Sequence, residues 1–259
     1  MTATAAAWRS AIVTGASSGI GRALAIELAQ RGVRELALVA RRAPELEQAA
    51  REVEAAGARA LVRVVDLADG DRAAAALRAI DDDLDGVDLV VANAGLGPRR
   101  DADPLAWETV RDALHVNVCG AAATLTALAP RMRDRRRGHL VGVGSISSFG
   151  ALPEALAYSS PKAALTMMLD CLRLDLAGAG VAVTAVHLGF VRTAMTAHST
   201  HWMPQLMEAE DCARALVNRL EGRPRAVTLP RALGVAARGL ALLPEPLREG
   251  IAKALRSPR

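Results

Sequence analysis

The sequence predicts an α/β protein with a doubly wound parallel sheet of seven strands and helices on both faces. Short apolar runs recur along the 259 residues, separated by longer stretches rich in Ala, Leu and Arg. Most of these runs lack polar alternation, which is typical of strands buried on both faces, and the stretches between them can hold crossover helices. A chain of this length with 51% hydrophobic residues can bury one substantial core, so residues 1–259 are expected to form a single domain.

Strands and helices are predicted to alternate along the chain. The predicted strands are 10–14, 35–40, 60–66, 88–95, 139–145, 181–189 and 226–230. The predicted helices are 19–31, 44–56, 71–82, 104–134, 156–178 and 209–221, several of which end near a glycine at 32, 57, 138 or 222 that fits a left-handed cap. Ligands of such sheets bind at the carboxyl ends of the strands, where the strand order reverses.

Composition narrows the possible functions. The net charge of +4 is the small difference between 32 basic and 28 acidic residues, and aromatics make up only 2%, so nucleic-acid binding is not expected. Cys119, Cys171 and Cys212 show neither disulfide nor metal-ligand spacing, which indicates a reducing compartment and no metal site. Since no stretch reaches the roughly 20 apolar residues that span a bilayer, a soluble, cytoplasmic protein is expected.

The segment TGASSGIG, residues 14–21, directly follows the first strand and opens a helix. Gly15 permits a sharp turn, Gly19 leaves room for a pyrophosphate, and Gly21 lets the helix approach the sheet closely. The free N–H groups and dipole of the helix N-terminus favour an anion there. On this segment alone, a plain strand-to-helix turn is the alternative interpretation. The other residues of the loop predicted to contact the cofactor are Ser17, Ser18 and Ile20.

The end of the second strand indicates which dinucleotide binds. Where an NAD site usually presents a carboxylate to the ribose, the chain has Arg41 and Arg42. Arg41 is predicted to clamp a 2'-phosphate, with Ser17 as a hydroxyl partner, so NADP(H) is favoured and NAD(H) remains possible. The alternative is that both arginines are ordinary solvated side chains. Asp66, followed by Leu67, is placed to accept a hydrogen bond from an adenine amine, although Asp is also a common turn residue.

Two rare residue types stand four positions apart in AYSSPKAAL. Tyr158 is the only tyrosine, and Lys162 is one of two lysines beside thirty arginines. In a helix, residues four apart share a face, so the ammonium lies near the phenol and would stabilise its phenolate. Pro161 is tolerable in a first helical turn, which predicts that the pair lies at a helix start. A tyrosine packed in the core beside an incidental lysine is the alternative.

Other scarce polar residues follow neighbouring strands. Of three asparagines, Asn93 lies in ANAG after the fourth strand and Asn117 lies in HVNVCG. Ser145 ends the fifth strand, thirteen residues before Tyr158, so its hydroxyl is predicted to reach the carbonyl oxygen that the phenol would protonate. Its neighbours Ser147 and Ser148 are rivals if the strand register is shifted.

With these motifs in view, the sequence resembles the short-chain dehydrogenase/reductase family, in its shorter single-domain branch, over roughly residues 8 to 230. The resemblance implies a Rossmann-type fold, a nicotinamide dinucleotide cofactor and a small carbonyl or alcohol substrate. It also implies a homodimer or homotetramer. A sugar-nucleotide epimerase or dehydratase of the longer branch is disfavoured, because those relatives usually carry a different glycine spacing and a larger C-terminal domain.

The resemblance also implies roles for four catalytic residues. Asn117 would bind a water in a proton relay, and Ser145 would orient the substrate carbonyl. Tyr158 would be the general acid or base. Lys162 would hold the nicotinamide ribose and lower the pKa of Tyr158.

Two further segments match the family pattern in the cofactor site. The NAG segment, Asn93, Ala94 and Gly95, would stabilise the central sheet beside the cofactor. In HLGFVRT, residues 187–193, a leucine at 188 replaces the usual proline of a Pro-Gly pair. The residues that remain there to bind the nicotinamide end are Gly189, Val191 and Thr193.

The predicted function is an NADPH-dependent carbonyl reductase or alcohol dehydrogenase acting on a lipophilic ketone or secondary alcohol. The alternative is a catalytically weak, NADP-binding regulatory protein with the same fold. Residues 194–208, rich in Met and His, are predicted to form a lid over an apolar substrate, and the histidines there are expected to be polar loop residues. In the tail, about 231–259, Leu247, Ile251 and Leu255 suggest an amphipathic helix. It could cover the active site, pack in a subunit interface or on the core, or, least favoured, touch a membrane.

Overall fold

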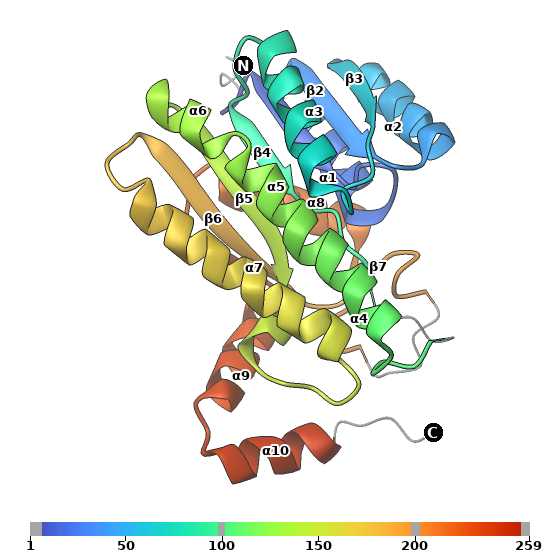
Figure 1. Ribbon diagram of the computed structural model, residues 1–259, viewed down its shortest axis with the longest axis vertical. Coiled ribbons are helices and arrows are strands. Elements are labelled where there is room, and N and C mark those ends of the chain that lie inside the picture. Colours follow the sequence, from blue (N-terminus) through green and yellow to red (C-terminus); the bar gives the residue numbers. More distant parts are fainter. Residues whose placement is uncertain (1–6, 98–101, 198–202, 255–259) are drawn as a thin grey trace.

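A computed structural model of the protein describes residues 7–97, 102–197 and 203–254. Its centre is a seven-stranded parallel sheet in the order β3-β2-β1-β4-β5-β6-β9, which confirms the predicted fold class (Figure 1). The strands are β1 (Ser10–Thr14), β2 (Glu35–Ala40), β3 (Arg59–Val64), β4 (Leu89–Ala92), β5 (Gly138–Ser145), β6 (Val181–Leu188) and β9 (Ala226–Leu229). The strand order reverses between β1 and β4, where a ligand site is expected. A separate pair of very short strands, β7 (Val191–Arg192) and β8 (Met207–Glu208), lies beyond the end of β6.

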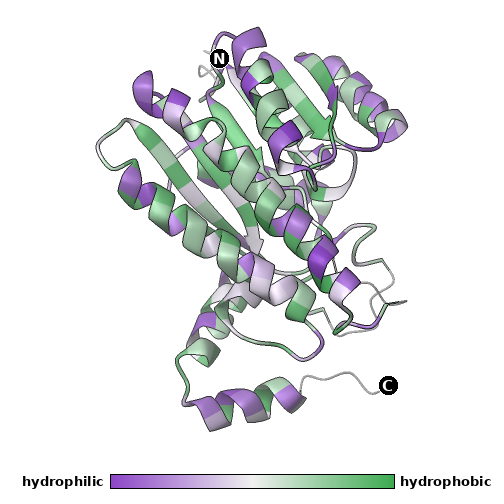
Figure 2. Cartoon of the chain, in the orientation of Figure 1, coloured by the Kyte–Doolittle hydropathy of each residue, from purple (hydrophilic) through white to green (hydrophobic). Residues whose placement is uncertain are grey.

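Helices cover both faces of the sheet. They are α1 (Gly19–Gln30), α2 (Ala43–Ala55), α3 (Gly70–Asp83), α4 (Trp107–Leu114), α5 (Ala121–Thr126), α6 (Ala129–Asp134), α7 (Leu156–Asp175), α8 (Ala209–Leu220), α9 (Arg231–Ala241) and α10 (Glu245–Ala254). Two apolar cores result, one beneath α1, α2 and α8 and the other beneath α3, α5, α6 and α7. In Figure 2 the strands are hydrophobic while the helices carry hydrophilic residues on their outer sides, as a sheet buried on both faces requires.

The predicted helix 104–134 begins at Trp107 and is not uniform. A π-helical stretch, His115–Gly120, separates α4 from α5, and α6 follows after residues 127 and 128. Within the described residues, Trp107–Asp134 is the one helical stretch long and apolar enough to cross a membrane. Half of its most apolar window is buried inside the fold, which is the pattern of a core helix against a sheet.

Two of the four predicted glycine caps are confirmed. Gly32 (φ 85°) and Gly57 (φ 101°) adopt left-handed backbone conformations just after α1 and α2. This conformation costs glycine little, because it lacks a Cβ.

The other two predicted caps are wrong. Arg136 (φ 52°) and Arg223 (φ 47°) take the left-handed conformation, and not Gly138 and Gly222. Gly138 is instead the first residue of β5, where a Cβ would lie 2.3 Å from the Sδ atom of Met132. It therefore permits a close approach of α6 to the sheet.

The C-terminal helices extend from the sheet layers at the end near the start of α7 (Figure 1). Helix α10 buries none of its residues, and Leu247 and Ile251 are 58% and 42% exposed. Packing of this helix on the core, one of the predicted possibilities, is therefore not seen. Leu255, the third residue of the predicted apolar stripe, lies outside the described residues.

A buried histidine links the start of β5 to β6. The Nε2 atom of His139 lies 2.8 Å from the hydroxyl of Thr184, and its ring lies 5.8 Å from that of Trp8. Burial, together with the nearby charge of Arg223, lowers the pKa of His139 to about 3. The folded protein therefore holds this imidazole neutral at neutral pH.

This histidine is expected to make the protein sensitive to acid. Below pH 6.5 His139 is protonated in the unfolded state but stays neutral in the folded state. The free energy of unfolding therefore decreases as the pH falls from 6.5 towards 3, and at pH 5 the loss is about 2 kcal/mol. His139→Phe should flatten the dependence of the unfolding free energy on pH in urea titrations. His115→Gln, a change at an exposed histidine, should leave it unaltered. An unchanged slope in His139→Phe would contradict this account.

Candidate active site

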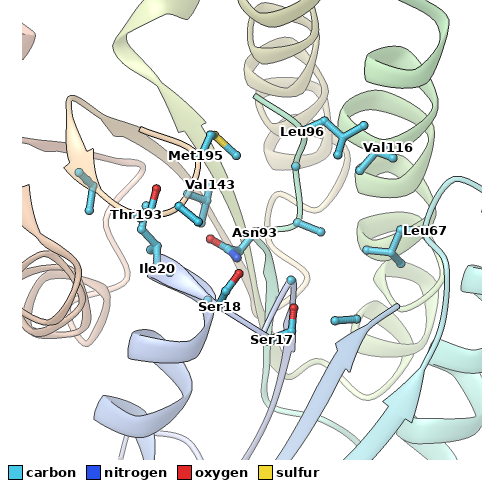
Figure 3. Close-up of a pocket in the computed structure, with 18 of the residues that line it drawn as sticks. Ser17, Ser18, Ile20, Leu67, Asn93, Leu96, Val116, Val143, Thr193 and Met195 are labelled. Carbon is cyan, nitrogen blue, oxygen red and sulfur yellow. The ribbon is translucent and has the colours of Figure 1, made fainter. Parts of the chain in front are cut away.

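A cavity of about 350 Å³ opens at the carboxyl ends of β1, β2, β4 and β5, where the strand order reverses. Every residue predicted to bind the cofactor lines it. Figure 3 shows side chains from the glycine loop, from the end of β4 and from the segment after β6 surrounding this space. Two predicted catalytic residues, Asn117 and Ser145, do not line the cavity, and they are only 1% and 7% exposed.

The glycines of the first loop are required by close contacts. At Gly15 (φ 70°) a Cβ would lie 2.8 Å from the Cα atom of Ala94, and at Gly21 it would lie 2.4 Å from the carbonyl oxygen of Gly15. At Gly19 (φ 54°) the nearest atom is Cγ2 of Thr193, at 3.1 Å. The loop is therefore folded tightly against the end of β4 and beneath the segment after β6, which leaves the backbone at the N-terminus of α1 open to the cavity.

Thr14 and Asn93 join the ends of β1 and β4. The Thr14 hydroxyl accepts hydrogen bonds from the backbone N–H groups of Asn93 (3.1 Å) and Ala94 (3.2 Å) and donates one to the carbonyl of Val91. The Asn93 amide in turn donates to the Thr14 carbonyl at 2.9 Å. This network accounts physically for the pairing of a Thr-Gly loop with an Asn-Ala-Gly segment.

The two arginines after β2 play different parts. Arg42 donates hydrogen bonds to the hydroxyls of Ser17 (3.1 Å) and Ser18 (2.8 Å) and pairs with Glu45 at 3.2 Å. Ser17 was predicted to help Arg41 hold a 2'-phosphate, and both residues line the cavity, although the protein partner of the Ser17 hydroxyl is Arg42. The Arg41 side chain makes no hydrogen bond or ion pair with any described residue, and it lines the cavity with its charge unneutralised.

Asp66 and Leu67 line the cavity beyond the end of β3. The Asp66 carboxylate accepts a hydrogen bond from the backbone of Ala68 at 3.0 Å. The residue therefore stabilises its own turn, as the alternative interpretation had it, while remaining beside the cavity.

Ser145, Tyr158 and Lys162 meet at the carboxyl end of β5. Ser145 ends the strand, and its hydroxyl is near enough to Tyr158, in the first turn of α7, to favour the phenolate. One helical turn later, the Lys162 ammonium lies 6.0 Å from the centre of the phenol ring and donates a hydrogen bond to the carbonyl of Val143 at 2.9 Å. The rival Ser148 faces elsewhere, because it donates to the Ser145 carbonyl at 2.7 Å. Pro161 lies in the second turn of α7 and not in the first as predicted.

Burial dominates the ionisation of this pair. It raises the pKa of Tyr158, against the opposing effect of the Ser145 hydrogen bond, and it lowers the pKa of Lys162 to about 8. Lys162 was predicted to lower the pKa of Tyr158, whereas in this structure burial raises it. At pH 7 the phenol therefore holds its proton and the amine remains charged.

Asn117 lies in the π-helical stretch, with both ends of its side-chain amide occupied. Its nitrogen donates to the carbonyl of Leu96 at 2.9 Å, and its oxygen accepts from the Leu96 backbone N–H at 2.6 Å. A Cβ on Gly95 would lie 3.1 Å from the Asn117 oxygen and 3.5 Å from the Lys162 nitrogen. The asparagine thus fixes the loop after β4 beside Lys162, so any water in a relay would have to use other atoms of this region.

The segment after β6 closes one side of the cavity. Leu188, which stands where the family has a proline, continues β6 by pairing with Ser145, and the Gly189 N–H donates to the Leu229 carbonyl at 2.7 Å. In the predicted lid, Met195 lies against Gly97, where a Cβ would be 2.4 Å from its Cγ. Figure 3 shows Met195 on the same side as Val143. Residues 198–202 of the predicted lid lie outside the described residues.

Several residues that line the cavity were not predicted from the sequence. Leu96, Val116 and Val143 line the cavity with apolar side chains, and the Val143 carbonyl also accepts the Lys162 hydrogen bond. Leu96 and Val143 directly adjoin predicted motifs at the ends of β4 and β5. Val116, one residue before Asn117, could have been found from the helical phase of that segment.

Comparison with known proteins gives consistent results. A family model described as short chain dehydrogenase matches residues 9–204. An uncharacterized oxidoreductase of Myxococcus xanthus is 44% identical over 249 residues, covering 96% of this chain and 98% of that protein. A short-chain dehydrogenase from Sphingobium yanoikuyae in complex with NADPH has a TM-score of 0.79 at 26% identity, covering 96% of this chain and 97% of that one. A short chain dehydrogenase from Mycobacterium paratuberculosis bound to NAD has a TM-score of 0.73 at 26% identity, covering 85% and 95%.

The solved relatives carry NADPH in one case and NAD in the other, at similar identity to this chain. They therefore support a nicotinamide dinucleotide without choosing between the two forms. Because the family model matches most of the chain, and the sheet order and the Myxococcus relative agree with it, the chain belongs to the short-chain dehydrogenase/reductase family and is an NAD(P)-dependent oxidoreductase.

Proposed function

We propose that this oxidoreductase is an NADPH-dependent carbonyl reductase, running in reverse as an alcohol dehydrogenase, for a lipophilic ketone or secondary alcohol. The observation that carries the proposal is the convergence of Tyr158, Ser145 and Lys162 beside the glycine loop. A protein that only bound the dinucleotide would need the loop but not a buried phenol next to a buried ammonium.

The residues present fit the cofactor. Gly15, Gly19 and Gly21 allow the loop to pack against Ala94, Asn93 and Thr193 where a Cβ would clash, and the N-terminus of α1 lines the cavity. This arrangement suits a pyrophosphate, and Lys162 and Thr193 lie on the cavity wall where the nicotinamide end would be held. The bound dinucleotide would supply the hydride.

Tyr158 is proposed as the proton donor in the reducing direction. Burial keeps the phenol protonated at neutral pH, so it can give its proton to the oxygen of a substrate carbonyl as negative charge develops there. Ser145, whose hydroxyl lies near the phenol, can donate to the same oxygen and so orient it. The charge of Lys162 would stabilise the phenolate that remains.

NADP(H) is preferred because of Arg41. Its guanidinium carries a full charge at the cavity edge without a carboxylate partner among the described residues, and Arg42 holds the adjacent serines of the glycine loop. A 2'-phosphate would supply the missing partner through charge-assisted hydrogen bonds. The lipophilic substrate is inferred from the apolar lining given by Leu96, Val116 and Met195.

Tyr158→Phe tests the chemistry. Because a general acid contributes about 10²- to 10⁴-fold, kcat for ketone reduction should fall by that order, while the NADPH dissociation constant changes only a few-fold. NADPH absorbance against a panel of lipophilic ketones measures the rate, and fluorescence titration measures binding. Ser160→Ala, which removes an exposed hydroxyl from the same helix, is the control and should retain activity. Normal turnover in Tyr158→Phe would refute the role of Tyr158 as the proton donor. A wild-type protein that binds NADPH but reduces no ketone would favour the regulatory alternative.

Arg41→Ala tests the cofactor choice. Loss of charge-assisted hydrogen bonds worth about 1.5 to 3 kcal/mol should raise the KM for NADPH about 10- to 100-fold and leave the KM for NADH nearly unchanged. Arg34→Ala, at the opposite end of β2, should alter neither value. Equal effects on both cofactors would show that Arg41 does not read the 2'-phosphate.

Lys162→Met should separate stability from activity. The folded pKa of about 8 lies below the ordinary 10.5, so burying the charge costs folding about 3 kcal/mol below pH 8. Between pH 8 and 10.5 the unfolded state binds more protons, so wild-type stability should rise with pH, and Lys162→Met should be more stable at pH 7 and lack that rise. Its turnover should be lost. Lys253→Met, at the only other lysine, should show neither effect. A less stable Lys162→Met would refute this reasoning.

A further inference from the structure

A stack of three side chains connects helix α9 to the turn that follows the catalytic strand. The guanidinium carbon of Arg238 lies 4.8 Å from the ring centre of Phe149, and the Phe149 ring lies 4.6 Å from that of His187. Phe149 ends the 3₁₀ turn Ile146–Phe149, which begins directly after Ser145. His187 lies on β6, paired with Gly144 of β5.

His187 fixes the turn from the strand side. Its Nδ1 atom lies 3.2 Å from the hydroxyl of Ser148, which in turn bonds the Ser145 carbonyl. The Ser148 hydroxyl donates to the Ser145 carbonyl, so that hydroxyl is left to accept from an Nδ1–H of His187. Burial and the nearby charge of Arg238 lower the pKa of His187 to about 4, which keeps the ring neutral.

Helix α9 is itself held firmly on the edge of the sheet. At Gly234 a Cβ would lie 2.0 Å from Cγ2 of Thr228 on β9, so the absence of a side chain lets the helix approach the strand. Arg238 also donates to the Thr228 hydroxyl at 3.3 Å, and it has no carboxylate partner among the described residues. Its charge is therefore available to the face of the Phe149 ring.

We propose that Arg238, through Phe149 and His187, positions the Ser145 turn and thereby the hydroxyl that orients the substrate carbonyl. Helix α9 is then a support of the active site and not a dispensable tail. The inference rests on the proposed function, because it assigns a positioning role within that same site. It adds three positioning residues, none of which was singled out as part of the site by the sequence motifs.

The test compares Arg238→Ala and Phe149→Leu with Arg231→Ala, which removes an exposed arginine of the same helix whose side chain makes no hydrogen bond or ion pair with a described residue. Because the interaction free energy of such a cation–π contact is modest, kcat should fall about three- to tenfold in Arg238→Ala and Phe149→Leu. The KM for NADPH should stay within about twofold, and Arg231→Ala should match the wild type. Arg238→Lys, which keeps a cation over the ring, should recover most of the rate.

Two further measurements separate positioning from general damage. In a Ser145→Ala background, Arg238→Ala should cost nothing more, because residues that act through one another are not additive. Hydrogen exchange of the peptide covering residues 145–150 should be faster in Arg238→Ala than in Arg231→Ala, and this readout requires no activity. Additive losses in the Ser145→Ala background, or equal exchange in the two arginine variants, would overturn the proposal. A wild-type protein that reduces no ketone would contradict the proposed function only. The hydrogen-exchange result would still show whether the stack of Arg238, Phe149 and His187 stabilises the turn after Ser145.

Discussion

The hydroxyl of Thr14 holds the two sides of the site together. It accepts from two backbone N–H groups after β4 and donates to a carbonyl of that strand, at the point where the order of the sheet reverses. The segments after β1 and β4 lead to helices on opposite faces of the sheet, so a cleft forms between them. Because these bonds set the separation between the glycine loop and the loop after β4, Gly15 must lie against Ala94 with no side chain of its own. The cavity, the glycine spacing and the Asn-Ala-Gly segment all follow from this one contact region.

Burial disfavours the charged forms of both Lys162 and Tyr158. Lys162 is 6% exposed and donates to one acceptor among the described residues, the carbonyl of Val143, so its folded pKa falls. Tyr158 responds in the other direction, because desolvation disfavours the phenolate more than the Ser145 hydrogen bond favours it. Burying this ammonium and this phenol therefore costs desolvation free energy, which the rest of the fold must offset. Such a site is stable only because the surrounding sheet and the helices α4 to α7 fix its walls.

The sheet and most residues that line the cavity could be predicted from the sequence, because both follow from local sequence patterns. Strand ends within a parallel sheet meet at one edge, so motifs placed after successive strands had to converge. Details that depend on tertiary contacts were not accessible. Whether Arg41 or Arg42 reaches Ser17 depends on side-chain conformation, and the ionisation of Tyr158 depends on burial. The left-handed residue after α6 is Arg136, since Gly138 is needed where Met132 crowds the start of β5. The contact of α9 with Phe149 joins residues 89 positions apart, and no local pattern indicates it.

The choice of lysine at position 162 also has a geometric reason. Thirty arginines serve this chain, many of them in surface ion pairs such as Arg63 with Asp83 or Arg192 with Glu208. At position 162 the ammonium lies close to Gly95, where a Cβ would be 3.5 Å from the nitrogen, and within the part of the chain that the structure describes it has one carbonyl acceptor, that of Val143. A guanidinium has five donors in a rigid plane and cannot lose its charge, so it would leave several donors unsatisfied in that space. An ammonium is compact, can turn between the carbonyl and a ligand hydroxyl, and can be buried at a smaller cost. The rarity of lysine in this sequence is therefore informative: the chain keeps one where an arginine could not be buried.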